Sequence, residues 1–275
     1  MGFDPASKDG VWVSDFIASR RTTRDFLPTP VPQALIDQIL KDSLTAPSWS
    51  NTRPFKVALA TGDKRDRISN EFLSRWQTLS AGMRGGLLSK LKLFIKRYGL
   101  PTSNRIILKP YVAELKPRAQ RVGKELYGAL GVARGDRVER DKHWGKNYEF
   151  FGAPVAMFVY IHKSLHIYAA SDAGLMMENL MLSAHAHGLG TCAQGAVSIW
   201  DDVVRNEFEI SKDYRLLCGI AVGYPSDAPV NSFKAHRIGI DELLFKPKPS
   251  KNQSPNQHPY YLGKLGNDAS QLLHP

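Results

Sequence analysis

The chain has 275 residues, of which 43% are hydrophobic and 23% are charged, a balance typical of a folded protein with a sizeable core. Its two cysteines, Cys192 and Cys218, exclude a disulfide framework and a cysteine-based metal site. The sequence lacks a signal-peptide core and any uninterrupted apolar run of roughly 18 residues, the length that membrane spanning requires, so we expect a cytoplasmic protein.

The net charge of +11 is concentrated in one stretch of the chain. Residues 84–146, which we call the basic segment, hold 16 Lys and Arg against 5 Asp and Glu, which accounts for the whole excess. Such a field can serve an anionic polymer, a membrane surface, an anionic substrate or a phosphorylated cofactor. A solvated basic face without any ligand is an equally ordinary interpretation.

The first eighty residues contain four predicted elements. Residues 11–20 are expected to form a short helix with Ser14 as its N-cap, and residues 32–45 a helix with one apolar face. A short apolar run at 55–61 has the character of a strand, and an amphipathic helix follows at 63–79.

Residues 81–148 lack the regular strand and helix pattern of the preceding residues. They contain scattered glycine and proline and several basic segments predicted to be helical, one of them at 117–130. We expect this stretch to be an excursion from the main fold, of the kind that often forms a lid or wall over a site. Strand character returns at 154–161 and 215–224, on either side of a long helix at 168–187 that ends at a glycine. After Lys246 the composition predicts an extended tail.

Three arginines and two threonines fall within five residues next to the end of the first helix. Arg20, Arg21 and Arg24, which we call the arginine cluster, suit a phosphate, because guanidinium groups donate paired hydrogen bonds to its oxygens. By itself the cluster is also compatible with ordinary surface arginines, so the motifs that follow it decide its meaning.

The order of motifs resembles that of the nitroreductase family of FMN enzymes. That family opens on R-R-S/T-x-R/K-x-F, then P-V-P, a helix, and A-P-S-x-x-N-x-Q-P-W ahead of a strand. Here the corresponding stretches, in chain order, are RRTTRDF (20–26), PVP (30–32), APSWSNTRPF (46–55), NYEFFGAP (147–154), DAGLMMENL (172–180), GLGTC (188–192), GYP (223–225), APVN (228–231) and Arg237.

The resemblance spans about residues 14–245 and implies the fold. It predicts an α+β protein with a central, mostly antiparallel sheet surrounded by helices, assembled as a homodimer with flavin sites at the interface. We therefore expect one nitroreductase-like FMN-binding domain over residues 1–245, with the excursion at 81–148, and a C-terminal tail at 246–275.

The same resemblance implies which residues bind FMN. Arg20, Arg21, Thr22, Arg24 and the distant Arg237 would meet the ribityl phosphate. Four further positions and a backbone glycine complete the expected site: Ser48 and Asn51 from the partner subunit, Asn147 at the pyrimidine edge, and Gln194 and Gly195 beside N5 and O4.

The chain departs from the family pattern at three positions. Arg53 stands where glutamine is usual, Phe55 where tryptophan is frequent, and Phe150 where some members place a flavin-contacting lysine. His185 and His187 are two residues apart near a helix end, a spacing that favours capping or exposure over metal chelation. We expect Cys192 to be a buried residue and not a nucleophile.

The function that the resemblance implies is hydride transfer from NADH or NADPH through flavin N5 to a nitroaromatic or quinone by a ping-pong mechanism. No catalytic side chain and no metal are expected, because the flavin supplies the redox chemistry. In this interpretation the basic segment forms a wall of the substrate channel and favours anionic ligands.

Two alternatives remain. The same fold also serves flavin-fragmenting and reductively dehalogenating enzymes. A basic nucleic-acid- or membrane-binding protein is the alternative outside enzymology, although the family interpretation predicts neither nucleic acid nor membrane as a partner.

Overall fold

The computed structural model describes residues 9–103 and 111–248 of the chain. It divides into two compact units, Met1–Ala235 and His236–Pro275, and each is described by itself. The second unit contains the short helix α9 (Ile240–Leu243). Most of the predicted tail from Lys246 onward lies outside the described residues, and the predicted domain boundary at residue 245 stays a prediction.

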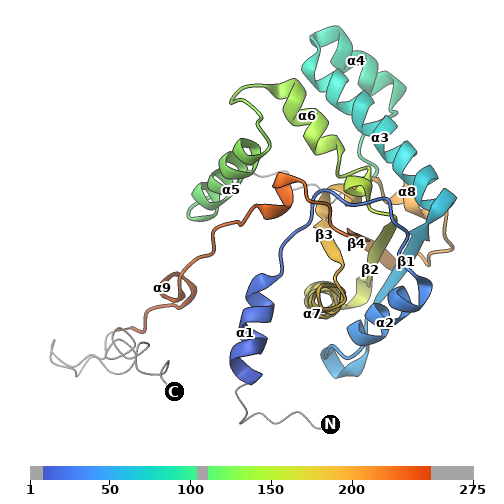
Figure 1. The fold of residues 1–275 in the computed structure, drawn as a ribbon. Coiled ribbons are helices and arrows are strands. Elements are labelled where there is room, and N and C mark those ends of the chain that lie inside the picture. The colour runs from blue at the N-terminus through green and yellow to red at the C-terminus, as the bar shows by residue number, and fades with distance from the viewer. Residues whose placement is uncertain (1–8, 104–110, 249–275) are drawn as a thin grey trace. The chain divides into compact units, whose positions relative to one another are not determined.

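The first unit is built on one four-stranded sheet (Figure 1). Its strands are β1 (Phe55–Thr61), β2 (Val155–His162), β3 (Gly190–Gln194) and β4 (Tyr214–Gly223), in the spatial order β1-β2-β4-β3. Every neighbouring pair is antiparallel, so the predicted antiparallel sheet is confirmed.

The sheet is covered on both faces, and alternation along β2 shows how the sequence achieves this. Ala156 and Phe158 belong to one buried cluster and Met157 and Val159 to another, as expected when successive side chains point to opposite faces. The first cluster packs against α3 (Gly62–Arg84) and the second against α2 (Gln33–Ser43) and α7 (His166–Ala186).

The other helices of the first unit are α1 (Asp9–Ser19), α4 (Leu87–Lys96), α5 (Leu115–Ala129), α6 (Arg137–Gly145) and α8 (Asp201–Arg205). It also has short 3-10 helices: η1 (Trp49–Asn51), η2 (Phe150–Gly152), η3 (Lys163–Leu165), η4 (Gly195–Trp200) and η5 (Pro229–Ser232). The predicted helices and strands are therefore present, with boundaries that shift by a few residues.

One capping assignment is wrong. Ser14 lies inside α1, where its hydroxyl donates to the carbonyl oxygen of Gly10 at 3.1 Å instead of capping the helix. Serine hydroxyls return to a preceding turn in this way when the helix begins earlier than its capping pattern suggests.

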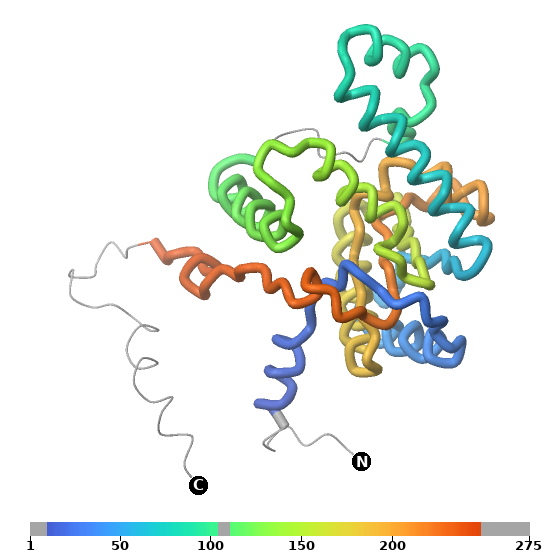
Figure 2. The backbone as a smooth tube through the Cα atoms, turned by 45° about the horizontal axis from the view of Figure 1, so that its top comes forward, coloured from blue at the N-terminus to red at the C-terminus, as the bar shows by residue number. Residues whose placement is uncertain are grey.

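In the described part of the stretch at 81–148, the helices after the end of α3 are α4, α5 and α6. Helix α4 folds back along the end of α3 (Figure 2). The chain that follows α4 is attached to the core through Trp200, whose ring nitrogen donates to the carbonyl oxygen of Leu100 at 3.0 Å. Trp200 is fully buried, and its ring packs 5.1 Å from that of Tyr148.

Across the described ranges, no helix is long and apolar enough to cross a membrane.

Candidate functional site

The arginine cluster lies on a segment that runs alongside β3. Thr22 forms a parallel bridge with Thr191, and the amide of Thr23 donates to the carbonyl oxygen of Thr191 at 2.9 Å. The pairing places Arg20 and Arg24 on either side of the bridge, so the edge strand of the sheet positions the cluster.

The segment and β3 are in unusually close contact. A methyl group added at Gly190 would meet the Oγ1 atom of Thr23 at 2.3 Å and its Cβ atom at 2.8 Å, distances that real side chains do not tolerate. Glycine at 190 therefore permits the segment to approach the strand.

Asn231 of η5 fixes the backbone immediately after the cluster. Its Oδ1 atom accepts from the amide of Arg24 at 2.8 Å, while its Nδ2 atom donates to the carbonyl oxygens of Asp25 at 2.8 Å and Ser226 at 2.9 Å. The sequence alone assigns Asn231 no role. The signal that pointed to it was its place in the APVN motif, and its role here is to position the segment that carries the arginine cluster.

Arg20 carries an unused hydrogen-bond donor. Its Nε atom lies 3.4 Å from Oε1 of Glu178, yet it is buried and has no hydrogen-bond partner in the described part of the chain. A buried N–H without a partner is costly, and a phosphate oxygen is the kind of acceptor that would remove this cost.

Two pKa shifts locate the arginines relative to α7 and β3. The pKa of His185 is lowered by burial and then by the positive charges of Arg20 and Arg21. Burial raises the pKa of the Cys192 thiol to about 12, and the charge of Arg24 opposes this rise. The cluster therefore gathers positive charge between the end of α7 and β3, the electrostatic condition for holding a phosphate.

The histidines at the end of α7 and Cys192 were expected to have structural roles and no chemical one. His187 is the exposed C-cap residue of α7, with its Nδ1 atom 2.8 Å from the carbonyl oxygen of Ser183, as expected. His185 is half-buried instead: its ring stacks on Phe16 at 5.2 Å and its Nε2 atom lies 2.7 Å from the hydroxyl of Ser19. Cys192 is buried, with a raised pKa that keeps its thiol protonated at neutral pH. No group of metal-ligating side chains occurs among residues 9–103 and 111–248.

At the carboxyl end of β3 the structure brings together Gln194, Gly195 and Asn147. The Nε2 atom of Gln194 donates to the carbonyl oxygen of Asn147 at 2.6 Å, and the Asn147 side chain donates to the carbonyl oxygen of Trp144 at 3.0 Å. Gly195 is exposed, with open space where a side chain would stand.

Gln194 also presents an unused acceptor. The residue is 2% exposed, and within the described residues its Oε1 atom is buried without a hydrogen-bond partner. The site therefore has an unsatisfied donor near one end of β3 and an unsatisfied acceptor at the other. That pattern fits a ligand with an anionic tail and an N–H-bearing ring, which are features of FMN.

Ser48 and Asn51 lie elsewhere. They precede β1, and two strands separate β1 from β3, which places the two edges roughly 14 Å apart. Ser50, Asn51 and Arg53 adopt left-handed φ values of 49°, 56° and 44°. One chain thus brings Arg20, Arg21, Thr22, Arg24, Asn147, Gln194 and Gly195 to β3, but it does not bring the 48–51 turn there.

Two of the atypical residues have structural roles in this protein. Arg53 donates from its backbone to the hydroxyl of Ser48 at 3.0 Å and from its guanidinium to Oδ1 of Asn51 at 2.5 Å, so it shapes the strained turn. Phe150 is a core residue, 1% exposed, and cannot take the place of a flavin-contacting lysine. Arg237 belongs to the second unit, and its role at the phosphate stays a prediction.

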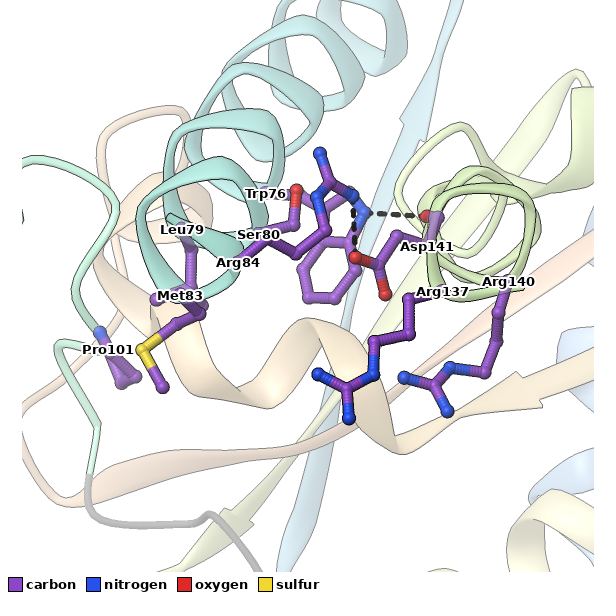
Figure 3. Close-up of a pocket in the computed structure, with 9 residues that line it drawn as sticks. All are labelled: Trp76, Leu79, Ser80, Met83, Arg84, Pro101, Arg137, Arg140 and Asp141. Atoms are coloured by element: carbon purple, nitrogen blue, oxygen red, sulfur yellow. Dashed lines mark hydrogen bonds and ion pairs between the residues drawn. The ribbon is translucent and has the colours of Figure 1, made fainter. Parts of the chain in front are cut away.

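A separate cavity of about 490 Å³ lies between α3 and α6 (Figure 3). Its apolar wall includes Trp76 and Met83, and an ion pair of 2.6 Å joins Arg84 to Asp141 inside it. None of the predicted cofactor-binding residues lines this cavity.

Comparison with known proteins gives the class to which this fold and site belong. The family model described as "Nitroreductase family" matches residues 17–224, and the chain belongs to that family.

Among individual proteins, the 4-nitrobenzoate reductase of Pseudomonas putida is 30% identical over 224 residues, which cover 80% of this chain and 89% of that protein. The nitroreductase NfnB of Mycolicibacterium smegmatis is 29% identical over 231 residues, covering 82% and 88%.

Solved structures agree with this placement. The FMN-dependent nitroreductase NfnB from Mycobacterium smegmatis, in complex with NADPH, superimposes with a TM-score of 0.73 at 26% identity, covering 87% of this chain and 99% of that one. The FMN- and NADPH-dependent NfnB from sphigopyxis sp. strain HMH gives a TM-score of 0.69 at 28% identity, covering 86% and 98%. The predicted family and fold are therefore confirmed.

Proposed function

We propose that this protein is an FMN-dependent oxidoreductase that uses NAD(P)H to reduce a nitroaromatic compound. The observation that carries the proposal is the layout along β3: the arginine cluster near one end, and Gln194, Gly195 and Asn147 at the other. Thr191 and Gln194 are separated by about 10 Å of strand, which leaves room for a ribityl chain between a phosphate and a ring. Family membership and the FMN named for the relatives support the assignment.

The protein's contribution to the reaction is binding and orientation. When bound, the flavin supplies the atom that accepts and returns hydride. Arg20, Arg21 and Arg24 would hold the phosphate, and Asn231 keeps their segment in place by accepting from the Arg24 amide. The buried Oε1 atom of Gln194 would be an acceptor for the N–H that N5 carries in the reduced ring, and the open space at Gly195 would admit an aromatic ligand. We infer a ping-pong order, in which donor and acceptor use this space in turn, with nitroarenes or quinones as acceptors.

We further propose that the protein is a cytoplasmic homodimer. Ser48 and Asn51 precede β1, which two strands separate from β3, so a second copy would supply them to the site. The exposed apolar side chains beside this turn support such an interface, since Trp49 is 54% exposed, Tyr168 49% and Leu175 45%.

The first prediction tests the activity itself. We expect purified protein to be yellow, to release FMN on denaturation, and to oxidise NADPH or NADH at least tenfold faster when 4-nitrobenzoate is present. The visible spectrum and the loss of nicotinamide absorbance measure both properties. Bound FMN without acceptor-stimulated oxidation would instead favour a flavin-fragmenting or dehalogenating enzyme. A colourless protein with steeply salt-dependent DNA binding would refute the flavin assignment.

The second prediction concerns the part of the basic segment that approaches the site. Helix α5 contacts η5, whose Asn231 holds Arg24, whereas α4 packs on α3. We propose that α5 forms the basic channel wall. In the variant R121Q/K124Q the KM for 4-nitrobenzoate should rise about two- to fivefold, because exposed charges attract an anion weakly, while the KM for nitrobenzene stays constant.

The matched control for this experiment is K90Q/K92Q on α4, which removes the same charge from outside the proposed channel. Steady-state kinetics with both substrates measure the difference. Equal KM values in the α5 variant and the unmodified protein would show that α5 does not select anionic substrates.

A further inference from the structure

Helix α4 exposes an apolar face that the proposed activity does not use. Five of its large side chains are more than half exposed: Leu87 at 83%, Leu88 at 75%, Leu91 at 54%, Phe94 at 61% and Ile95 at 71%. Their spacing of i, i+1, i+4, i+7 and i+8 puts them on one face of the helix. A contiguous exposed patch of this kind usually marks an interaction surface.

The helix is attached to the protein by its opposite side. Leu93 is the buried residue of α4, at 4% exposed. It packs so closely on α3 that a methyl group added at Gly82 would meet the Cδ2 atom of Leu93 at 3.0 Å. The apolar face therefore points away from the protein's own core.

The charged side chains of α4 itself are all positive. Lys90 and Lys92 flank it on its two sides, and Lys96 and Arg97 follow at its carboxyl end, all exposed. No aspartate or glutamate occurs between Glu71 and Glu114. Long basic side chains beside an apolar face are the pattern of a helix that lies in the plane of a membrane surface, with the apolar side chains in the lipid and the ammonium groups at anionic headgroups.

A cavity at the end of the helix adds to this surface. It measures about 450 Å³ and is lined by Phe94, Arg97, Leu100, Pro101 and Thr102. The cavity combines the aromatic ring of Phe94 with the guanidinium group of Arg97. The guanidinium suits the phosphate of a lipid headgroup, and the ring suits the adjoining part of the acyl chain.

The charge distribution favours a lipid surface over the other possible occupants. A second α4 would bring four further cations against those already present. The last 27 residues of the chain carry two lysines and one aspartate, so they do not offer complementary charge either. Nucleic acid would match the cations but leave the five apolar side chains exposed to water.

We propose that α4 docks this protein onto anionic membrane surfaces as a peripheral, in-plane helix. Binding requires both the apolar face formed by Leu87, Leu88, Leu91, Phe94 and Ile95 and the surrounding lysines. The docking is independent of the proposed redox activity, since α4 holds no residue assigned to the flavin.

The third prediction tests this docking by co-sedimentation of the full chain with phosphatidylcholine vesicles, with and without one third phosphatidylglycerol. The protein should bind the anionic vesicles and not the neutral ones. L91S/F94S should lower the partition coefficient at least tenfold, and K90Q/K92Q/K96Q about fivefold for each lysine removed. Raising the salt concentration to about 0.5 M should also lower the partition coefficient of the unmodified protein.

Matched controls carry equal changes outside α4. L115S/V138S replaces two exposed apolar residues, 47% and 52% exposed, and K41Q/K116Q/K212Q removes three exposed lysines. Both should bind within twofold of the unmodified protein. The proposal is overturned if anionic vesicles are not bound, or if the α4 variants bind as well as the controls. It is also overturned if L91S/F94S instead abolishes self-association in the absence of lipid, since α4 would then be a contact between chains.

Discussion

Replacing Arg20 and Arg237 together by alanine is expected to produce a folded protein that has lost FMN, with affinity for the cofactor at least 100-fold lower. Each guanidinium-to-phosphate contact is a charge-assisted hydrogen bond worth about 1.5–3 kcal/mol, so losing two of them accounts for a change of this size. Flavin content per chain, from the visible spectrum, and titration with added FMN measure the result.

The fold should survive because Arg20 contributes little to it. Its ion pair is with Glu178, a side chain that is 45% exposed and that water can solvate once the arginine is gone. Removal of Arg20 also eliminates a buried donor that lacks a partner in the described structure. The circular dichroism spectrum should therefore remain that of the unmodified protein.

The single variants separate the contributions of the two units. R20A alone tests the segment beside β3, and R237A alone tests whether the second unit contributes to the phosphate. K41A, on the exposed side of α2, removes one positive charge without touching the site and should keep its FMN. Stoichiometric flavin in the double variant would contradict the assignment of the arginine cluster.

The parts of the fold that could be predicted from sequence are those with a strong period. The runs at 55–61, 154–161 and 215–224 became β1, β2 and β4, and the long apolar pattern at 168–187 became α7. Their apolar side chains fill the two faces of one sheet, so the local pattern and the tertiary packing agree.

Strand β3 was not predicted, although the candidate site depends on it. Its sequence, GTCAQ, is five residues long and contains one β-branched residue, so neither length nor period distinguishes it from a loop. It becomes a strand through pairing with β4 on one side, while the arginine segment bridges to it on the other.

The site residues were assigned by resemblance, and the structure explains why spacing alone could not have grouped them. Thr22, Asn147 and Gln194 are far apart in sequence. They come to one strand because Thr22 bridges to Thr191 of β3, while Gln194 at the end of β3 donates to the carbonyl oxygen of Asn147. Asn231 shows the limit of the motif. Its place in the sequence motif could be seen, but its three hydrogen bonds, to the backbone of Arg24, Asp25 and Ser226, emerge only in three dimensions.

Substituting alanine for Gly190 is expected to weaken FMN binding about tenfold or more and to lower the free energy of unfolding by about 1–3 kcal/mol, the usual cost of overpacking. The new methyl group would sit 2.3 Å from Oγ1 and 2.8 Å from Cβ of Thr23. Rotating the threonine side chain cannot move its Cβ atom, so the backbone segment must withdraw from β3. Arg20 and Arg24 would move with it.

A Gly-to-Ala change elsewhere supplies the control. Gly123 lies inside α5 with open space around it, so G123A should leave FMN binding intact and raise stability by up to about 1 kcal/mol. In G190A, adding T23A removes the Oγ1 and Cγ2 atoms but leaves the 2.8 Å contact, so recovery should be partial. Thermal unfolding and flavin titration measure both properties. If G190A kept full stability and full FMN affinity, the close approach of Thr23 to β3 would not be what positions the phosphate-binding arginines.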